Sequence, residues 1–131
     1  MKLELKHLVP YSTYKLNYFV DFEDGDVAVY EMIGMFTDSG EIYLDGYETN
    51  LDSKNCKPIL RPLSDLTKNI DDNNNNLTYA AFLKLWVKSD VDYVINMPLS
   101  CYYDTVEQLF KWHFDVFGLV EKGLAIDINT L

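Results

Sequence analysis

The chain has few of the residues from which metal, redox and phosphate-binding motifs are built. Cys56 and Cys101 are its only cysteines, and neither belongs to a Cys-x-x-Cys pair. Nothing indicates an oxidising compartment, so we expect both thiols to be reduced. The six glycines form neither a GxGxxG nor a Walker-type loop. We therefore predict no metal site and no cofactor.

Long apolar runs are also absent. No uninterrupted run approaches the roughly 20 residues that a membrane helix needs, and residues 1–7 lack the apolar core of a signal peptide. We therefore expect a cytoplasmic protein. The 131 residues are 48% hydrophobic and include ten Tyr, seven Phe and two Trp, which is enough apolar content for a folded core. We expect a single domain spanning residues 1–131.

Basic residues are missing from residues 16–53, which we call the acidic stretch. The chain has 21 acidic and 11 basic residues, and ten of the acids lie here. Removing those ten leaves 11 against 11, so the acidic stretch accounts for the net charge of −10. A charge concentrated in one region produces a directed field that a partner can recognise. The ten carboxylates belong to Asp21, Glu23, Asp24, Asp26, Glu31, Asp38, Glu41, Asp45, Glu48 and Asp52.

The first half of the chain, residues 1–56, has the pattern of an antiparallel sheet. Residues 15–20, 27–36 and 41–44 are rich in β-branched and aromatic side chains, and turns with Asp and Gly separate them. Three strands joined in this way predict a meander with one buried face and one wet face. Alternation along the second strand places Val27, Val29, Ile33 and Met35 on one side, and Ala28, Tyr30, Met32 and Phe36 on the other.

Residues 57–77 change character. Pro58 and Pro62 confine any strand there to a sheet edge. Residues 64–67 could open a short helix, and residues 71–76, Asp-Asp followed by four Asn, predict a polar loop.

The helical half, residues 57–131, continues with two helical patterns. Thr78 predicts an N-cap for the first. Asp104, three residues before Glu107, predicts a capping box for the second, which we expect to end at Gly118. Alternation over residues 124–128 predicts a short final strand, in the sheet or in a local hairpin. The apolar positions of the second helix are Val106, Leu109, Phe110, His113, Phe114 and Phe117.

Together these patterns predict an α+β fold. An N-terminal antiparallel β-meander is followed by two or three helices and a short C-terminal strand. We expect the helices to cover the apolar face of the sheet through Phe82, Trp86, Leu109, Phe110 and Phe117.

The acidic residues do not all have the same explanation. Aspartates in turns bond nearby backbone and are expected there. Glu31, Glu41 and Glu48 lie in or beside strands, where acids are disfavoured, so they suggest a solvated face, a protected edge or a binding surface. Carboxylates mixed with Tyr and Phe could occupy a basic groove built for nucleic acid. The predicted partner-binding residues are Glu23, Asp24, Asp26, Glu31, Glu41, Asp45 and Glu48.

Few residues point to catalysis, to metal binding or to direct binding of nucleic acid. We predict that the chain is not an enzyme, because no catalytic constellation stands out. His113 has no second metal ligand at a suitable spacing, so we expect a packed histidine with one hydrogen bond. Residues 21–26 resemble a calcium loop only superficially, since alignment of Gly25 puts Val20 at the first ligand position. The acidic stretch would repel phosphate, so we expect no direct binding of duplex DNA. Because long apolar runs are absent, we expect no membrane partner either.

Two segments carry a resemblance. Residues 112–129, WHFDVFGLVEKGLAIDIN, resemble the ending of small proteins of unassigned function encoded by bacteriophages and prophages. Residues 57–66, KPILRPLSDL, resemble another segment of that group. The resemblance implies a phage setting in a bacterial host cell, and it does not imply a mechanism.

In that setting, a short acidic protein without catalytic motifs is similar in kind to anti-CRISPR proteins, which bind a CRISPR effector and often block its guide-RNA or target channel. We therefore predict a non-enzymatic inhibitor whose partner is a protein with a basic nucleic-acid-binding groove, such as a CRISPR effector or another host nuclease. One alternative is a phage accessory or structural protein that docks through its C-terminal tail. Another is a winged-helix-like module with a hairpin through residues 122–123 after Gly118.

Overall fold

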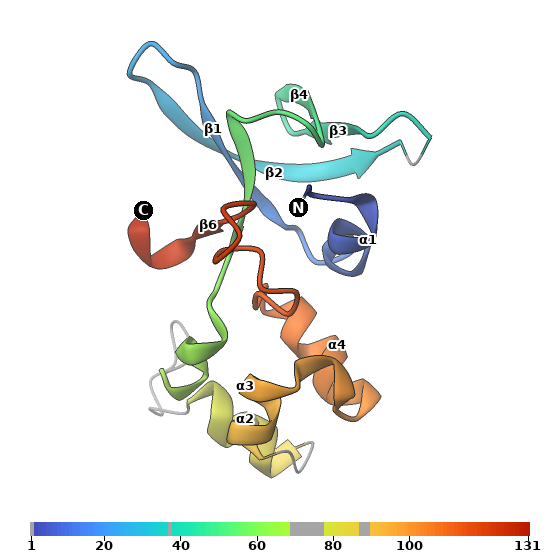
Figure 1. Ribbon diagram of the computed structural model, residues 1–131, viewed down its shortest axis with the longest axis vertical. Coiled ribbons are helices and arrows are strands. Elements are labelled where there is room, and N and C mark those ends of the chain that lie inside the picture. The colour runs from blue at the N-terminus through green and yellow to red at the C-terminus, as the bar shows by residue number, and fades with distance from the viewer. Residues whose placement is uncertain (1, 37, 69–77, 87–89) are drawn as a thin grey trace.

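The structure is a computed structural model that describes residues 2–36, 38–68, 78–86 and 90–131. Within these residues, six strands form one sheet in the order β4-β3-β2-β1-β5-β6, with short helices beside it (Figure 1). The architecture confirms the predicted α+β class. The strands are β1 (Asn17–Asp21), β2 (Val27–Met35), β3 (Glu41–Leu44), β4 (Tyr47–Asn50), β5 (Cys56–Leu60) and β6 (Ile126–Asp127).

The meander follows the predicted turns. Strand β1 pairs antiparallel with β2, β2 with β3, and β3 with β4. The fourth strand, β4, was not predicted. Its pairing depends on the tight turn at Asp45 and Gly46, where Gly46 has φ 105° and an added Cβ would lie 3.4 Å from the Tyr30 ring. Glycine is suited to this position because it has no Cβ to strain or crowd the turn.

A β-bulge changes the predicted alternation of β2. Met32 pairs with Leu44, but Gly34 pairs with Tyr43, so Ile33 is an extra residue in the strand. The shift turns Met35 toward buried Ile42, whereas alternation predicted that Met35 shares a side with Ile33. Phe36, predicted on the opposite side with Met32, is exposed.

Strands β5 and β6 complete the sheet beyond β1. Strand β5 lies between β1 and the parallel strand β6, so the expectation of an edge strand is wrong for β5 as a whole. The expectation of an edge position is met at Pro58 itself, because β6 pairs only with Ile59 and Leu60 and so does not extend beside Pro58. Strand β6 lies within the predicted segment 124–128 and joins the sheet in place of a local hairpin.

An N-terminal segment that was not predicted packs beside the sheet. It consists of helix α1 (Leu5–Leu8) and the 3₁₀ helix η1 (Val9–Tyr11). The imidazole Nδ1 of His7 accepts a hydrogen bond from the Glu4 backbone N–H at 3.0 Å, which closes the first turn. Leu8 and Tyr11 are fully buried, and the sheet, the helices and the C-terminal segment share one hydrophobic core.

The other helices match the predictions in part. They are the 3₁₀ helices η2 (Leu63–Thr67), η3 (Pro98–Ser100) and η4 (Ile128–Thr130), and the α-helices α2 (Tyr79–Trp86), α3 (Val91–Asn96) and α4 (Tyr103–Lys111). The Thr78 hydroxyl accepts a hydrogen bond from the Ala81 N–H at 3.0 Å, as predicted for an N-cap. The polar loop 71–76 and the side chain of Trp86 lie outside the described part of the structure.

Helix α4 differs from the prediction at both ends. Tyr102 is its N-cap, so Asp104 lies inside the first turn and forms no capping box with Glu107. The helix ends at Lys111, well before Gly118. The cause is a pairing with distant residue Arg61, whose backbone N–H donates to the His113 carbonyl at 2.8 Å, while its own carbonyl accepts from the Asp115 N–H at 2.7 Å. These long-range bonds replace helical ones.

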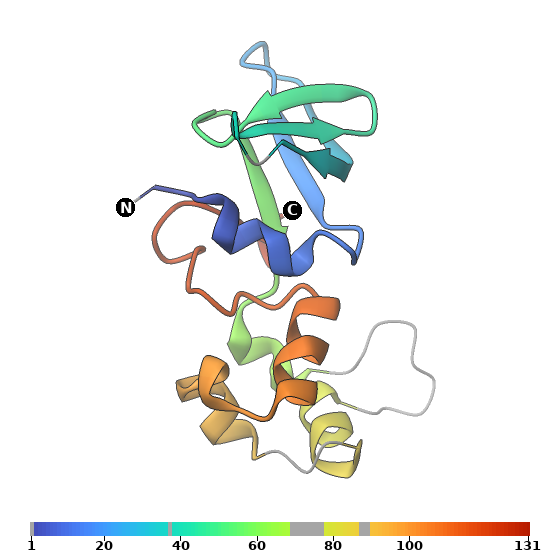
Figure 2. The same ribbon diagram turned by 90° about the vertical axis from the view of Figure 1, so that its right-hand side faces the viewer.

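The later helices do not cover the sheet as predicted. Both views show α2, α3 and α4 grouped beyond one end of the sheet, while α1 lies alongside it (Figures 1 and 2). Phe110 of α4 packs edge-on against Tyr11, and Phe117 packs edge-on or tilted against His7 and Phe110. The N-terminal segment therefore occupies the place that we expected the helices to fill. Phe82 contacts Trp112.

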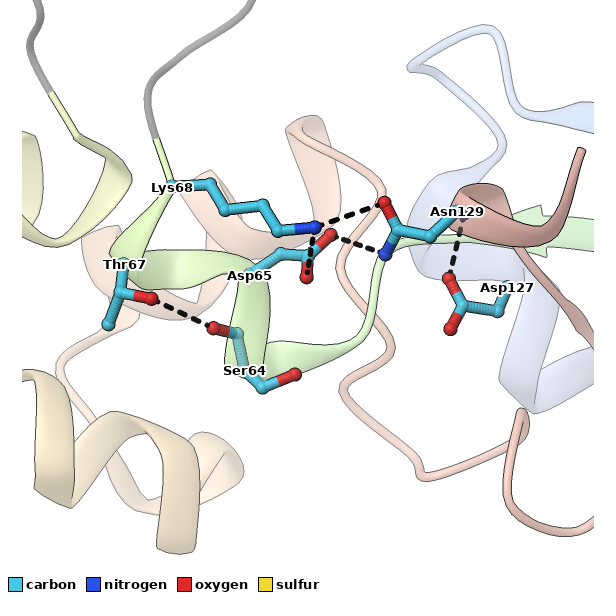
Figure 3. A network of polar contacts seen from close by, with 6 residues as sticks. All are labelled: Ser64, Asp65, Thr67, Lys68, Asp127 and Asn129. Atoms are coloured by element: carbon cyan, nitrogen blue, oxygen red, sulfur yellow. Dashed lines mark hydrogen bonds and ion pairs between the residues drawn. The ribbon is translucent and has the colours of Figure 1, made fainter.

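A polar network ties the C-terminus to η2. The buried Asp65 carboxylate contacts Lys68 Nζ at 3.2 Å and accepts a hydrogen bond from Asn129 Nδ2 at 2.8 Å (Figure 3). Asn129 in turn accepts from Lys68 Nζ at 3.2 Å. Asp127 caps η4 by accepting from the Asn129 N–H at 2.9 Å. The cluster satisfies a buried charge and holds η4 against η2, which identifies it as structural.

Candidate protein-binding face of the sheet

The strand register places Glu31, Glu41 and Glu48 on one face of the sheet. Glu48 lies opposite Tyr43, and Glu41 is two residues from Tyr43 along β3, so these three side chains share a face. Glu31 precedes Met32, which pairs with buried Leu44 and therefore faces the core. Glu31 must then face the other way, with Glu41 and Glu48. We call this side the open face.

Exposed apolar side chains lie around these glutamates. Val27, Val29, Ile33 and Phe36 are each between 51% and 66% exposed, although they are large and hydrophobic. Val27 and Val29 alternate with the core residues of β2 and so belong to the open face. Exposed apolar residues gathered on one surface and bordered by charge are typical of protein-interaction sites.

The pKa of Tyr43 shows how the charges of the open face act on a neighbouring side chain. Its hydroxyl donates a hydrogen bond to Glu41 Oε2 at 3.0 Å, and Phe36 packs edge-on against its ring at 5.2 Å. Partial burial, the bond to Glu41 and the charges of Glu41 and Glu48 together raise the pKa of Tyr43. The negative charges of two strands therefore act on one aromatic side chain.

The turn acids of the predicted site lie elsewhere and have local roles. In the turn between β1 and β2, Asp24 accepts a hydrogen bond from the Asp26 backbone N–H at 3.0 Å, and Glu23 accepts from Asn55 Nδ2 at 3.1 Å. Asp45 lies in the turn between β3 and β4, where its N–H donates to the Glu31 carbonyl at 2.8 Å. The structure therefore divides the predicted set into an in-strand group and a turn group.

The open-face charges are not neutralised locally. Among the described residues, salt bridges join Lys6 to Glu4 and Lys68 to Asp65, and no described Lys or Arg pairs with an acid of the acidic stretch. Lys57 also belongs to this face, but it lies on β5 and is separated from the strands of these acids by Phe19 of β1. Asp21 shares the face, opposite Val27, and was missed because it comes at the end of β1, next to the predicted turn.

The chain was compared with protein families, curated proteins and solved structures. None of them matches. The open face is therefore interpreted from its own chemistry.

The histidines and cysteines offer no second site. His113 forms one hydrogen bond, from Nε2 to the Tyr14 carbonyl, as predicted, and burial lowers its pKa. It follows α4 in a left-handed conformation with φ 63°. Both cysteines are free, as expected, and Cys56 is buried. No group of three or more His, Cys, Asp or Glu residues suited to a metal ion occurs within the described ranges.

Two buried carboxylates were missed by the sequence analysis. Asp65 belongs to the network with Asn129 described above. The carboxylate of Asp115 accepts hydrogen bonds from the Leu119 and Val120 backbone N–H groups, at 2.7 and 2.9 Å. Asp115 stands in the segment that predicted a helix, so its neighbours along the chain did not indicate a capped loop. Both groups stabilise the fold.

No helix within the described residues is both long and apolar enough to cross a membrane. The C-terminal tail, residues 112–129, is largely built into the core, with Phe114 and Leu119 fully buried.

Proposed function

We propose that this protein is a non-enzymatic inhibitor that binds, through its open face, the basic groove of a protein that handles nucleic acid. The setting we propose is the cytoplasm of a bacterial host cell infected by a phage, and the partner to test first is a CRISPR effector nuclease. Glu31, Glu41 and Glu48 would take the place of nucleic-acid phosphates. The observation that carries the proposal is that these three acids share one face.

The composition of the open face supports a protein partner. Carboxylates steer a basic partner and choose it over others, while apolar contacts such as Val29 and Phe36 supply affinity. The open face of a second copy is a poor partner, because the glutamates of the two copies would repel each other. A nucleic acid is a poor partner for the same reason.

The two alternatives have less support. Docking through the tail has a smaller surface to use, because Phe114 and Leu119 are fully buried in the core. A winged-helix-like module requires a helix that ends at Gly118 and a hairpin through residues 122–123. Helix α4 instead ends at Lys111, and β6 pairs in parallel with β5.

Capture of the partner at two salt concentrations tests the proposal. Tagged protein would be incubated with a lysate of bacteria that carry a CRISPR effector, and then washed at ~0.1 M and ~1 M salt, between which the Debye length falls from about 10 Å to about 3 Å. We expect a nucleic-acid-binding protein to be retained at low salt and lost at high salt. The triple variant Glu31→Gln, Glu41→Gln, Glu48→Gln should retain it about tenfold less, the equivalent of 1.4 kcal/mol.

The turn group provides the matched control. The variant Glu23→Gln, Asp24→Asn, Asp26→Asn also changes the net charge from −10 to −7, because it too removes three carboxylates. Its amide oxygens can still accept the turn hydrogen bonds, and we expect capture within about twofold of wild type, since charges outside an interface centre contribute little. Equal capture by wild type and the open-face variant would refute the proposal.

A further inference from the structure

A cavity of about 520 Å³ opens on another part of the molecule. Three chain segments form it: residues 2–3 at the N-terminus, residues 51–57 around the start of β5, and residues 123–124 before β6. Its size lies in the range of small-molecule sites, which are typically about 300–1,000 Å³. Its lining residues are Lys2, Leu3, Leu51, Asp52, Ser53, Lys54, Cys56, Lys57, Gly123 and Leu124.

The charge of this cavity is opposite to that of the chain. Lys2, Lys54 and Lys57 line it, and Asp52 is the one acid among its lining residues. Of 11 basic residues in a chain with net charge −10, three therefore gather at one hollow. None of the three forms an ion pair with a described acid, so their charges are available to a ligand.

Apart from Ser53, the rest of the lining is apolar. Leu3 and Cys56 are buried, and Leu51 and Leu124 are half-buried and pack against the core. A charged rim over an apolar floor selects ligands that carry both features. The adjoining hollow shows the contrast: it shares Leu3, Leu51 and Asp52, but Glu4, Asp38 and Glu41 line it and no lysine does.

We propose that the lysine-lined cavity binds a small organic anion with an apolar body, of which an aliphatic carboxylate is the simplest form. The carboxylate contacts the lysine rim, and the aliphatic chain lies against Leu3, Leu51 and Leu124. Lys57, which pairs with Phe19, is the one lysine that this site shares with the open face. The proposal does not depend on the proposed function. A neutral or cationic molecule of the same length lacks the contact with the lysines.

Titration with octanoate, followed by amide chemical shifts in NMR, tests the proposal. Octylamine, which has the same chain with the opposite charge, is the ligand control. We expect octanoate to shift the amides of Ser53, Lys54, Gly123 and Leu124 in a saturable way, and octylamine to leave them unchanged. Shifts that are equal for the two probes, that lie elsewhere, or that are absent throughout would overturn the proposal.

Two pairs of variants test the role of the lysines. We expect Lys2→Ala with Lys54→Ala to weaken octanoate binding at least fivefold. The control pair, Lys6→Ala with Lys111→Ala, changes the net charge equally on residues outside the cavity and should leave the affinity within twofold. All four side chains are exposed, so the fold should survive in both. Equal affinities of the two pairs would contradict the assignment.

Discussion

Tyr11 and Tyr18 are both buried tyrosines, but their hydroxyls differ in their hydrogen bonds. The Tyr11 hydroxyl donates to the Phe114 carbonyl and accepts from the Val116 N–H. The Tyr18 hydroxyl has no hydrogen-bond partner among the described residues. Burial raises the pKa of both side chains, so each stays neutral and its hydroxyl needs a partner of its own.

This difference predicts opposite effects of one substitution. We expect Tyr18→Phe to raise the free energy of unfolding by on the order of 1 kcal/mol, because it removes a buried polar group without a partner. Tyr11→Phe should lower it by about 1–3 kcal/mol, because both hydrogen bonds of a buried hydroxyl are lost. Urea denaturation measures both. A clear loss of stability in Tyr18→Phe would show that its hydroxyl has a partner.

The two histidines predict how stability depends on pH. Burial lowers the pKa of His7 and His113 from the ordinary value of 6.5. The unfolded chain therefore binds more protons than the folded one below that pH, and the stabilisation present above about 6.5 is lost as the pH falls. We expect both imidazoles to titrate with NMR midpoints below 6.5, and stability to fall from pH 7.5 to 5.5. A midpoint above 6.5 for either would contradict this.

Individual positions differed in how well the sequence predicted them. Alternation placed Val29 and the buried Met32 on opposite sides, because a strand repeats every two residues. It failed at Met35, because a bulge at Ile33 adds one residue and reverses the side of every residue after it. The buried charge of Asp65 could not be foreseen either, because its partner Asn129 is 64 positions away.

At the scale of elements, Asp115 takes the place of a helix end. Its carboxylate holds the backbone N–H groups of Leu119 and Val120, and its own N–H bonds Arg61. We expect Asp115→Ala to cost about 3 kcal/mol, since two hydrogen bonds to a buried charge are lost. Thermal or urea unfolding provides the measurement.

Asp104 is the control for this prediction. It is exposed, forms no cap bond, and contributes only through its place in the first turn of α4. We expect Asp104→Ala to cost less than about 1 kcal/mol. If Asp104→Ala cost as much as Asp115→Ala, the capping box expected from the sequence would be present after all.

Elements were predictable where their signals were local. The turns at residues 23–26 and 45–46, and the Thr78 cap, depend on neighbours in the chain and were foreseen. The end of α4 at Lys111 and the packing of α1 depend on contacts with Arg61 and with Phe117, which lie far away in the sequence. A helical pattern that continues through His113 and Phe114 cannot reveal that Arg61, just after β5, forms hydrogen bonds with the same backbone.

At the scale of the whole molecule, the charge is organised by surface. Glu31, Glu41 and Glu48 come from three strands and reach one face, whereas Lys2 and Lys54 line a cavity elsewhere. The segregation of acids was visible in the sequence, because residues 16–53 contain no lysine or arginine. The lysine-lined cavity was not visible, because segments at both ends and in the middle of the chain form it.

The most direct test of the proposed function is a competition for nucleic acid. The captured partner, loaded with its fluorescently labelled guide RNA or target DNA, would be titrated with this protein while anisotropy reports release. We expect wild type and the turn-group variant to displace or block the nucleic acid, and the variant Glu31→Gln, Glu41→Gln, Glu48→Gln to need about tenfold more protein. Simultaneous binding of protein and nucleic acid, or full competition by the open-face variant, would contradict the role of this face.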